Sequence, residues 1–258
     1  MLRAVEEAAE EAGLILLRTA GEGFRIFEKQ GHELVTTADR LSEEFLRERL
    51  GEIDPSAAFY GEETSGDSMP PPPLWIVDPL DGTNNYAHGY PAYSVSIAYC
   101  GTEGITLGCI RDPLRRETFS ASLGGGSRLN GESIRCTSLS SLDSALLATG
   151  FPYHRKRDDL GLDLGVLKHF LGRVQGIRRG GSAALDLAYV ACGRLDGFWE
   201  EHLKPWDMAA GTLLVTEAGG RAAAWEGGEW TRFAQGVTAS GPGIHEEMVL
   251  GVRGAETP

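Results

Sequence analysis

Cysteine and histidine are scarce in this chain, and neither forms a pattern that binds metal. The 258 residues include four cysteines and six histidines, and no two cysteines have the CxxC spacing. Zinc sites use such close pairs, and disulfide scaffolds need more cysteines for their length. The sequence therefore excludes both kinds of site, and isolated thiols of this kind are typical of a cytoplasmic protein.

Long apolar runs are also missing. No stretch of roughly 18 apolar residues occurs, which is the length that a membrane-spanning helix needs. The N-terminus reads MLRAVEEAAEEAG, which is charged throughout and lacks the apolar centre of a signal peptide. We therefore expect a cytoplasmic protein with no membrane contact.

Positive charge is the third shortage, because the formal net charge is −13. A surface with that much negative charge repels nucleic acid and anionic lipid, so the sequence argues against both as partners. A negatively charged substrate would be repelled as well, unless a cation lay between the substrate and the protein.

The chain is long and apolar enough for a sizeable core, with 41% hydrophobic residues. Apolar periodicity predicts helices first, then a run of short antiparallel strands, then alternating helices and strands. We therefore predict a layered α+β or α/β sandwich with two lobes, residues 1–138 and 139–258, in a single compact unit. The expected helices cover 5–16, 39–50, 160–171, 184–191 and 205–217, and the expected strands cover 33–37, 74–77, 93–99, 105–109, 118–122, 145–149 and 198–200, with a two-residue hairpin turn at 130–131.

Two aspartates follow a short apolar strand in the segment WIVDPLDGT, residues 75–83. An ordinary turn is one explanation, because Asp-Pro and Asp-Gly pairs are common in turns. However, Asp78 and Asp81 lie close together at the tip of a buried strand and would repel each other, so we infer a cation between them. Carboxylates are hard oxygen ligands and favour Mg²⁺ or Ca²⁺ over zinc. Thr83 can begin a helix, whose free N–H groups suit a phosphate.

Three segments together carry a family resemblance: GEE at 61–63, WIVDPLDGT at 75–83 and WDMAAG at 206–211. In this order they resemble the inositol monophosphatase family, lithium-sensitive Mg²⁺-dependent phosphatases related to fructose-1,6-bisphosphatase. The segment LLVTEAGG at 213–220 is similar to the helix end that follows the third motif. The resemblance implies the αβαβα sandwich of these phosphatases, hydrolysis of inositol monophosphate to inositol and phosphate, and a homodimer.

The resemblance also implies a set of metal ligands. Glu62, Asp78 and the backbone carbonyl of Leu80 would hold one Mg²⁺ ion. Asp81 and Asp207 would hold a second ion, with Asp78 bridging the two, and the family binds two or three ions in all. The cations would explain how an acidic protein acts on an anionic substrate, because they reverse the local sign of the charge.

The remaining roles implied by the resemblance concern catalysis and the substrate. Asp39 and Thr83 would orient and deprotonate the attacking water, and Glu62 belongs to the same catalytic set. Backbone N–H groups of Gly82 and Thr83 would bind the phosphate. Glu200 would accept hydrogen bonds from the hydroxyl groups of inositol. The implied substrate-binding residues are Asp81, Gly82, Thr83, Ala183, Glu200 and Asp207.

Several alternatives stay open at this point. Asp39 could cap the second helix, and Asp207 could be an ordinary acid in a first helical turn. Trp206 is expected to pack against neighbouring side chains rather than stack on the substrate. Arg178 and Arg179 could contact a second phosphate, a partner subunit or only solvent. Alternative activities are those of a fructose-1,6-bisphosphatase or of a 3′-nucleotide, NADP or histidinol phosphatase, and a non-catalytic regulatory partner is a further alternative.

Overall fold

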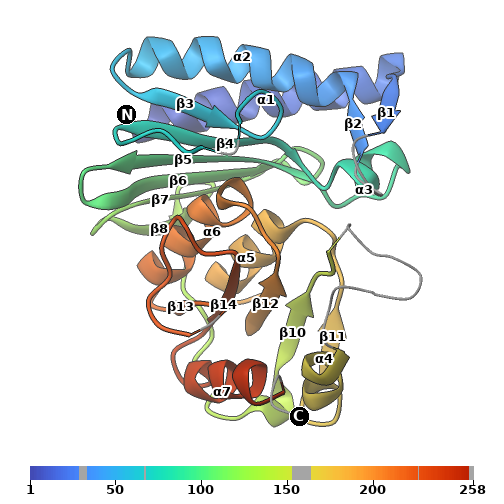
Figure 1. Ribbon diagram of the computed structural model, residues 1–258, viewed down its shortest axis with the longest axis vertical. Helices are drawn as coiled ribbons and strands as arrows, with labels where there is room; N and C mark the ends of the chain where they lie inside the picture. The colour runs from blue at the N-terminus through green and yellow to red at the C-terminus, as the bar shows by residue number, and fades with distance from the viewer. Residues whose placement is uncertain (29–33, 67, 153–163, 226, 256–258) are drawn as a thin grey trace.

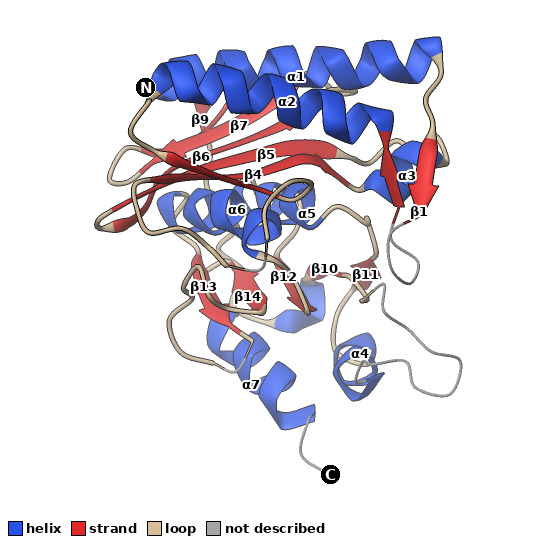
Figure 2. Cartoon of the chain, turned by 45° about the horizontal axis from the view of Figure 1, so that its top comes forward, coloured by secondary structure: helices blue, strands red, loops and turns tan. Residues whose placement is uncertain are grey.

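The computed structural model describes residues 1–258 apart from 29–33, 67, 153–163, 226 and 256–258. Its elements stack in alternating layers of helices and sheets (Figure 1). Helices α1 and α2 cover one face of a seven-stranded sheet, and α5 and α6 lie between that sheet and a five-stranded one. Helices α4 and α7 cover the far face of the smaller sheet (Figure 2). The αβαβα sandwich predicted above is confirmed.

The first layer consists of α1 (Leu2–Glu22) and α2 (Thr37–Ile53). Each helix presents a buried apolar stripe to the sheet, as its periodicity predicts. We expected α2 to end at Gly51, but the helix continues to Ile53. Glycine here costs the helix about 1 kcal/mol relative to alanine, which the rest of the helix outweighs, and the helix closes when the Asp54 N–H donates to the Leu50 carbonyl.

The seven-stranded sheet is largely the predicted meander. Six of its strands are antiparallel neighbours in sequence order, but β3 pairs parallel to β4, which the sequence pattern did not reveal. The predicted hairpin turn at Asn130-Gly131 joins β8 to β9, and both turn residues have positive φ. The strands are β3 (Ala58–Gly61), β4 (Leu74–Asp81), β5 (Ser94–Gly101), β6 (Gly104–Asp112), β7 (Glu117–Ser122), β8 (Gly126–Leu129) and β9 (Glu132–Ser133).

The five-stranded sheet has the order β11-β10-β12-β14-β13 and mixes parallel and antiparallel pairs. Its strands are β10 (Leu146–Thr149), β11 (Gly176–Arg178), β12 (Gly197–Glu201), β13 (Arg221–Ala224) and β14 (Gly236–Ser240), and its outer helices are α4 (Leu164–Leu171) and α7 (His245–Ala255). A 3₁₀ turn η1 (Leu142–Ser144) precedes β10. Residues 160–163 of the predicted helix 160–171 lie outside the described residues.

Helices α5 (Ala183–Ala191) and α6 (Pro205–Glu217) form the middle layer. Small side chains let them approach both sheets closely: a Cβ atom on Gly108 of β6 would lie only 2.8 Å from the Ala210 carbonyl oxygen. One apolar cluster runs from β4–β7 through these helices to β14, so a common core joins the two sheets.

The short elements complete the fold. Strands β1 (Ile26–Glu28) and β2 (Leu34–Thr36) form a small antiparallel pair, and α3 (Thr83–Ala87) follows β4. Strand β2 falls within the predicted strand 33–37, of which residue 33 lies outside the described residues. In the part of the chain that the structure describes, no helix combines the length and apolar character needed to cross a bilayer.

Candidate metal centre

Strand β4 carries Asp78 and Asp81 and is buried along its whole length. We expected the strand to end at Asp78 and a turn to follow, but it continues through Asp81. Asp78 is paired with Ser96 and Asp81 with Ser94, so three steps along β4 match two along β5. This bulge at Pro79, which has no N–H to donate, inserts one extra residue. In a regular strand, positions three apart face opposite sides, and the bulge turns both carboxylates toward the same side.

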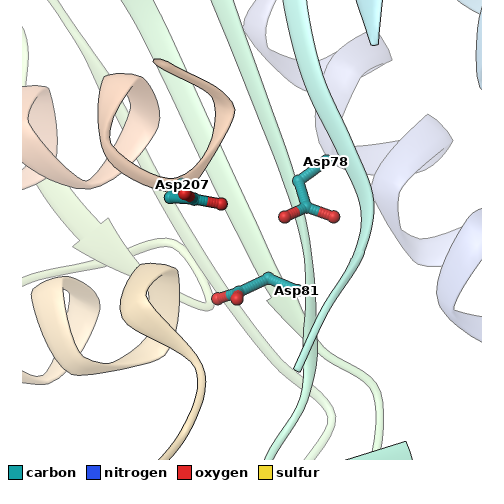
Figure 3. Close-up of side chains that lie close together, drawn as sticks. All are labelled: Asp78, Asp81 and Asp207. Carbon is teal, nitrogen blue, oxygen red and sulfur yellow. The ribbon is translucent and has the colours of Figure 1, made fainter. Parts of the chain in front are cut away.

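Asp207 completes the cluster from the first turn of α6. One ligand oxygen from each of Asp78, Asp81 and Asp207 lies within 4.8 Å of the other two (Figure 3). Asp78 is 1% exposed and Asp81 is 9% exposed, whereas Asp207 is partly open to solvent. Segments more than 120 residues apart in the chain therefore bring three carboxylates to one point.

Each aspartate of the cluster is fixed through a single oxygen. Asp78 Oδ1 accepts from the Leu80 N–H at 2.9 Å, and Asp207 Oδ2 accepts from the Lys204 N–H at 2.7 Å. Asp81 Oδ2 accepts from the Ser182 hydroxyl at 2.5 Å and the Ala184 N–H at 2.8 Å. Within the described residues, no side-chain or backbone donor contacts Asp78 Oδ2 or Asp207 Oδ1, so these oxygens remain available to a cation.

Burial and mutual repulsion make this cluster electrostatically costly without a cation. Burial raises the pKa of Asp78, and the charges of Glu62, Asp81 and Asp207 raise it further. Burial likewise raises the pKa of Asp207, with Asp81 and Glu62 adding to the effect. The pKa of Asp81 is raised by burial to about 6, although hydrogen bonds from Ser182 and α5 oppose the shift. Such a set of hard oxygen donors fits Mg²⁺, whose charge would let all of them ionise.

Glu62 lies beside the cluster at the end of β3, where its N–H donates to the Val77 carbonyl of β4 at 3.2 Å. Its charge raises the pKa of both Asp78 and Asp207, so its carboxylate lies near the cluster, although it is not one of the three whose oxygens lie within 4.8 Å of one another. The Leu80 carbonyl oxygen, also an expected ligand, lies 3.0 Å from Thr83 Oγ1. All five predicted metal ligands therefore lie in one region.

Asp39 and Thr83 are in direct contact. The Thr83 hydroxyl lies 3.0 Å from Asp39 Oδ1, and the Thr36 N–H and hydroxyl donate to Asp39 Oδ2 at 2.7 and 2.6 Å. Thr36 and Asp39 form a capping box at the start of α2, so the capping alternative considered above is also real. Burial raises the pKa of Asp39 despite these hydrogen bonds, which makes its carboxylate a stronger base.

Gly82 connects the metal cluster to the helix α3 that begins at Thr83, where a helix start was predicted. Its φ of +93° is in the left-handed region, and a Cβ atom would lie 2.9 Å from the Ala92 carbonyl oxygen. Both facts require glycine at this position. The N–H groups of the first helical turn have no acceptor within the helix, so they can face an anion.

The start of α5 supports Asp81 more closely than the sequence suggested. Ala183, a predicted substrate residue, lies in the first turn and its N–H helps to lower the pKa of Asp81. Ser182, which we did not predict as a site residue, is the N-cap of α5 and donates to Asp81. The signal was present, because serine directly before an apolar helical run is a strong N-cap.

Three further charged groups lie near Asp81. Burial raises the pKa of Glu200 in β12 to about 8, while the Arg179 guanidinium opposes this shift and Asp186 and Asp81 add to it. Asp186 of α5 was missed by sequence analysis, although it is the single acid in the apolar segment AALDLAYVA. Arg178 and Arg179 are both exposed. Trp206 is partly buried and packs on Tyr60 with ring centroids 5.2 Å apart, in agreement with the expected packing role.

Comparisons with known proteins give a consistent result. A family model described as "Inositol monophosphatase family" matches residues 1–256. A Pseudomonas aeruginosa protein named "Nus factor SuhB" is 43% identical over 85% of this chain and 83% of its own length. An "Inositol-1-monophosphatase" from Rhizobium meliloti is 42% identical over 88% of this chain and 86% of its own. The crystal structure of the extragenic suppressor protein suhB from Bartonella henselae superimposes with a TM-score of 0.90 at 37% identity, covering 97% of both chains.

Proposed function

The chain belongs to the inositol monophosphatase family, and on that premise we propose that it is a Mg²⁺-dependent phosphomonoesterase that hydrolyses inositol monophosphate to inositol and phosphate. One observation carries the proposal: two buried carboxylates of β4 and a partly exposed one of α6 have ligand oxygens within 4.8 Å of one another. An acidic protein with this cluster can attract a cation and, through it, an anionic ester.

Glu62, Asp78, the Leu80 carbonyl, Asp81 and Asp207 are the residues that would hold the ions. Mg²⁺ at this position would neutralise charge on the transferring phosphoryl group and lower the pKa of a nearby water. The protein fixes the donors in advance, because backbone N–H groups of Leu80, Lys204 and Ala184 orient the three aspartates. Pre-oriented ligands bind metal more tightly than mobile ones.

Asp39 and Thr83 supply the base. The Thr83 hydroxyl can take a proton from the attacking water while its own proton passes to Asp39 Oδ1, 3.0 Å away. Two donors from Thr36 hold the other Asp39 oxygen, so the carboxylate cannot rotate away from Thr83. The resulting hydroxide would attack phosphorus while the ester P–O bond breaks on the opposite side, and the leaving alkoxide would take a proton from solvent to give the alcohol.

The substrate would lie between α3 and β12. The N–H groups of Gly82 and Thr83 would bind the phosphate, Glu200 would accept hydrogen bonds from the hydroxyl groups of the ring, and Ala183 would be a further substrate contact. A carboxylate accepts strong hydrogen bonds from hydroxyl groups, which suits a polyol better than a planar base.

Phosphate release from inositol 1-phosphate tests the proposal. We expect turnover that requires Mg²⁺, stops with a chelator and is suppressed by Li⁺. Fructose 1,6-bisphosphate, adenosine 3′,5′-bisphosphate, NADP and histidinol phosphate form the comparison panel. A clear preference for one of these esters would replace the proposed substrate, and no release from any of them would refute the phosphatase activity.

A second candidate function comes from the 43%-identical relative named as a Nus factor. A role of that kind needs no turnover, whereas the buried cluster and the Asp39–Thr83 contact are arrangements that catalysis uses. A variant that has lost phosphatase turnover would separate the two roles, because it would lose the catalytic role and keep a non-catalytic role. The expected homodimer and cytoplasmic location stay predictions.

A further inference from the structure

Asp186 is a buried carboxylate that the mechanism above does not use. It lies in the first turn of α5 and is 5% exposed. Among the residues that the structure describes, its carboxylate has no hydrogen-bond donor and no ion pair. A buried acid in that state costs stability. Packing therefore does not explain why an aspartate occupies this position in an otherwise apolar helix.

Two glycines make room for Asp186 and for Glu200. A Cβ atom on Gly180 would lie 2.8 Å from Asp186 Oδ1, and one on Gly150 would overlap the Glu200 carboxylate. Neither glycine has a positive φ, so backbone conformation does not require glycine at either position. The missing side chains instead let both carboxylates lie against the backbone.

Both acids belong to elements beside the metal centre: the Ala184 N–H in the same first turn of α5 donates to Asp81, and β12, which carries Glu200, packs against α5. The charge of Asp81 raises the pKa of Asp186 and of Glu200, and Asp186 raises that of Glu200 as well. The Arg179 guanidinium lowers the pKa of all three acids. Within the described part of the chain, however, Arg179 forms no ion pair with any of them. The oxygens of Asp186 and Glu200 are therefore free to accept hydrogen bonds from a ligand.

We propose that Asp186 is a specificity-determining residue that, with Glu200, binds the hydroxyl groups of the polyol part of the substrate. This inference rests on the proposed phosphatase function and adds a residue to it. Carboxylates only accept hydrogen bonds and hydroxyl groups can donate them, so a polyhydroxylated ring satisfies both acids. An ester of a plain alkyl alcohol offers no donor and leaves both acids unsatisfied.

A pair of matched esters tests the proposal. Inositol 1-phosphate and cyclohexyl phosphate have the same six-membered ring, and only the first carries further hydroxyl groups. With Asp186→Asn, we expect kcat/KM for inositol 1-phosphate to fall about tenfold or more, mainly through KM. For cyclohexyl phosphate the change should stay within about threefold. Asp143→Asn, on the exposed turn η1, is the control and should change neither value.

Gly180→Ala gives a second test that keeps every charge. The added Cβ atom displaces the Asp186 carboxylate, so this variant should show the same selective loss, and it decides the matter if Asp186→Asn does not fold. Equal losses for both esters would mean that Asp186 acts through the metal centre, and no loss would mean that it has no role. Either result overturns the proposal. The proposal is also overturned if wild type prefers histidinol phosphate, which carries an ammonium group, and the Asp186→Asn variant loses that preference. Wild-type protein inactive toward both esters would instead overturn inositol 1-phosphate as the substrate, and this inference with it.

Discussion

Asp81 shows how a single side chain can join folding to catalysis. Its carboxylate accepts hydrogen bonds from Ser182 and from the start of α5, and one of its oxygens lies within 4.8 Å of an oxygen of Asp78 and of Asp207 (Figure 3). Asparagine at this position can keep the first contact through its Oδ1, but it loses the charge. The two roles of Asp81 can therefore be separated by one substitution.

We expect Asp81→Asn to lower kcat by at least about 100-fold, because a metal ligand supplies several kcal/mol of transition-state charge stabilisation. Phosphate release from inositol 1-phosphate at saturating Mg²⁺ measures the effect, with circular dichroism as the control for folding. Turnover at the wild-type rate would show that Asp81 holds no catalytic ion.

The same substitution should stabilise the metal-free protein. Burial raises the pKa of Asp81 from 3.8 to about 6, so the folded state binds a proton more tightly than the unfolded chain does. Stability from this group is therefore lost as the pH rises from about 4 to about 6, and it stays lost above that range. An asparagine side chain never ionises, so we expect the variant to exceed wild type by roughly 2–3 kcal/mol at pH 8, and by less at pH 5.

Urea unfolding in the presence of a chelator, at pH 5 and pH 8, measures this difference. If the difference in the free energy of unfolding between the variant and wild type does not grow with pH, the Asp81 carboxylate is already neutralised in the metal-free protein. Mg²⁺ should remove this difference in stability at pH 8, because only wild type binds Mg²⁺ well and is stabilised by it.

Thr83 carries the next prediction at this scale. Thr83→Ala removes the hydroxyl that contacts Asp39, and we expect kcat to fall about 100-fold, the usual loss when a proton-transfer group is removed. Thr83→Ser keeps the hydroxyl and should retain most of the activity. The Mg²⁺ concentration that gives half-maximal rate should be similar in both variants. If the alanine variant were as active as the serine variant, the proposed base would be wrong.

At the scale of elements, helix starts do much of the positioning. The capping groups of α2, α5 and α6 include Asp39, Ser182 and Asp207, and each also contacts the catalytic region. Capping fixes a side chain through backbone geometry, which is more rigid than a contact between two flexible side chains. The ends of the helices therefore fix the site as well as stabilise the fold.

Ser182→Ala tests this double use of a cap. Loss of the N-cap should destabilise the protein by about 1 kcal/mol, and loss of the hydrogen bond to Asp81 should weaken Mg²⁺ binding about tenfold. Ser141→Ala is the matched control, since Ser141 caps the exposed η1 turn away from the site. Calorimetric titration with Mg²⁺ measures both variants. Equal Mg²⁺ affinities would show that Ser182 serves only the helix.

The sequence predicted most elements, and its failures have local physical causes. The three motifs and the periodic helices were sufficient to locate Glu62, Asp78 and Asp207. The bulge at Pro79 was not predictable, because its register depends on the pairing of β4 with β5. The length of α2 depended on a glycine whose cost the rest of the helix outweighs. Asp186 was missed because its neighbours belong to α5, β12 and β4, which only tertiary packing brings together.

At the scale of the whole molecule, the site lies between the larger sheet and the middle helices. Asp78 and Asp81 belong to the seven-stranded sheet, whereas Asp207 belongs to a helix that also contacts the five-stranded sheet (Figure 1). A bound cation would therefore tie the first part of the chain to the last. The order of these residues in the sequence could not show that Asp78, Asp81 and Asp207 lie close together, although the family resemblance implied it.

Metal binding should accordingly stabilise the whole fold. At a Mg²⁺ concentration of 100 times Kd, we expect about 2.7 kcal/mol of added stability, measured by urea unfolding with and without chelator. Asp207→Asn should lose most of this gain. A Mg²⁺ effect of the same size in that variant would place the ion elsewhere.

The most direct test is anomalous diffraction from crystals soaked in Mn²⁺, which replaces Mg²⁺ and can be identified by its scattering. We predict a strong anomalous peak among the carboxylates of Asp78, Asp81 and Asp207, and its loss in Asp81→Asn crystals. A map without a peak there, from protein that still hydrolyses the ester with Mn²⁺, would contradict the account.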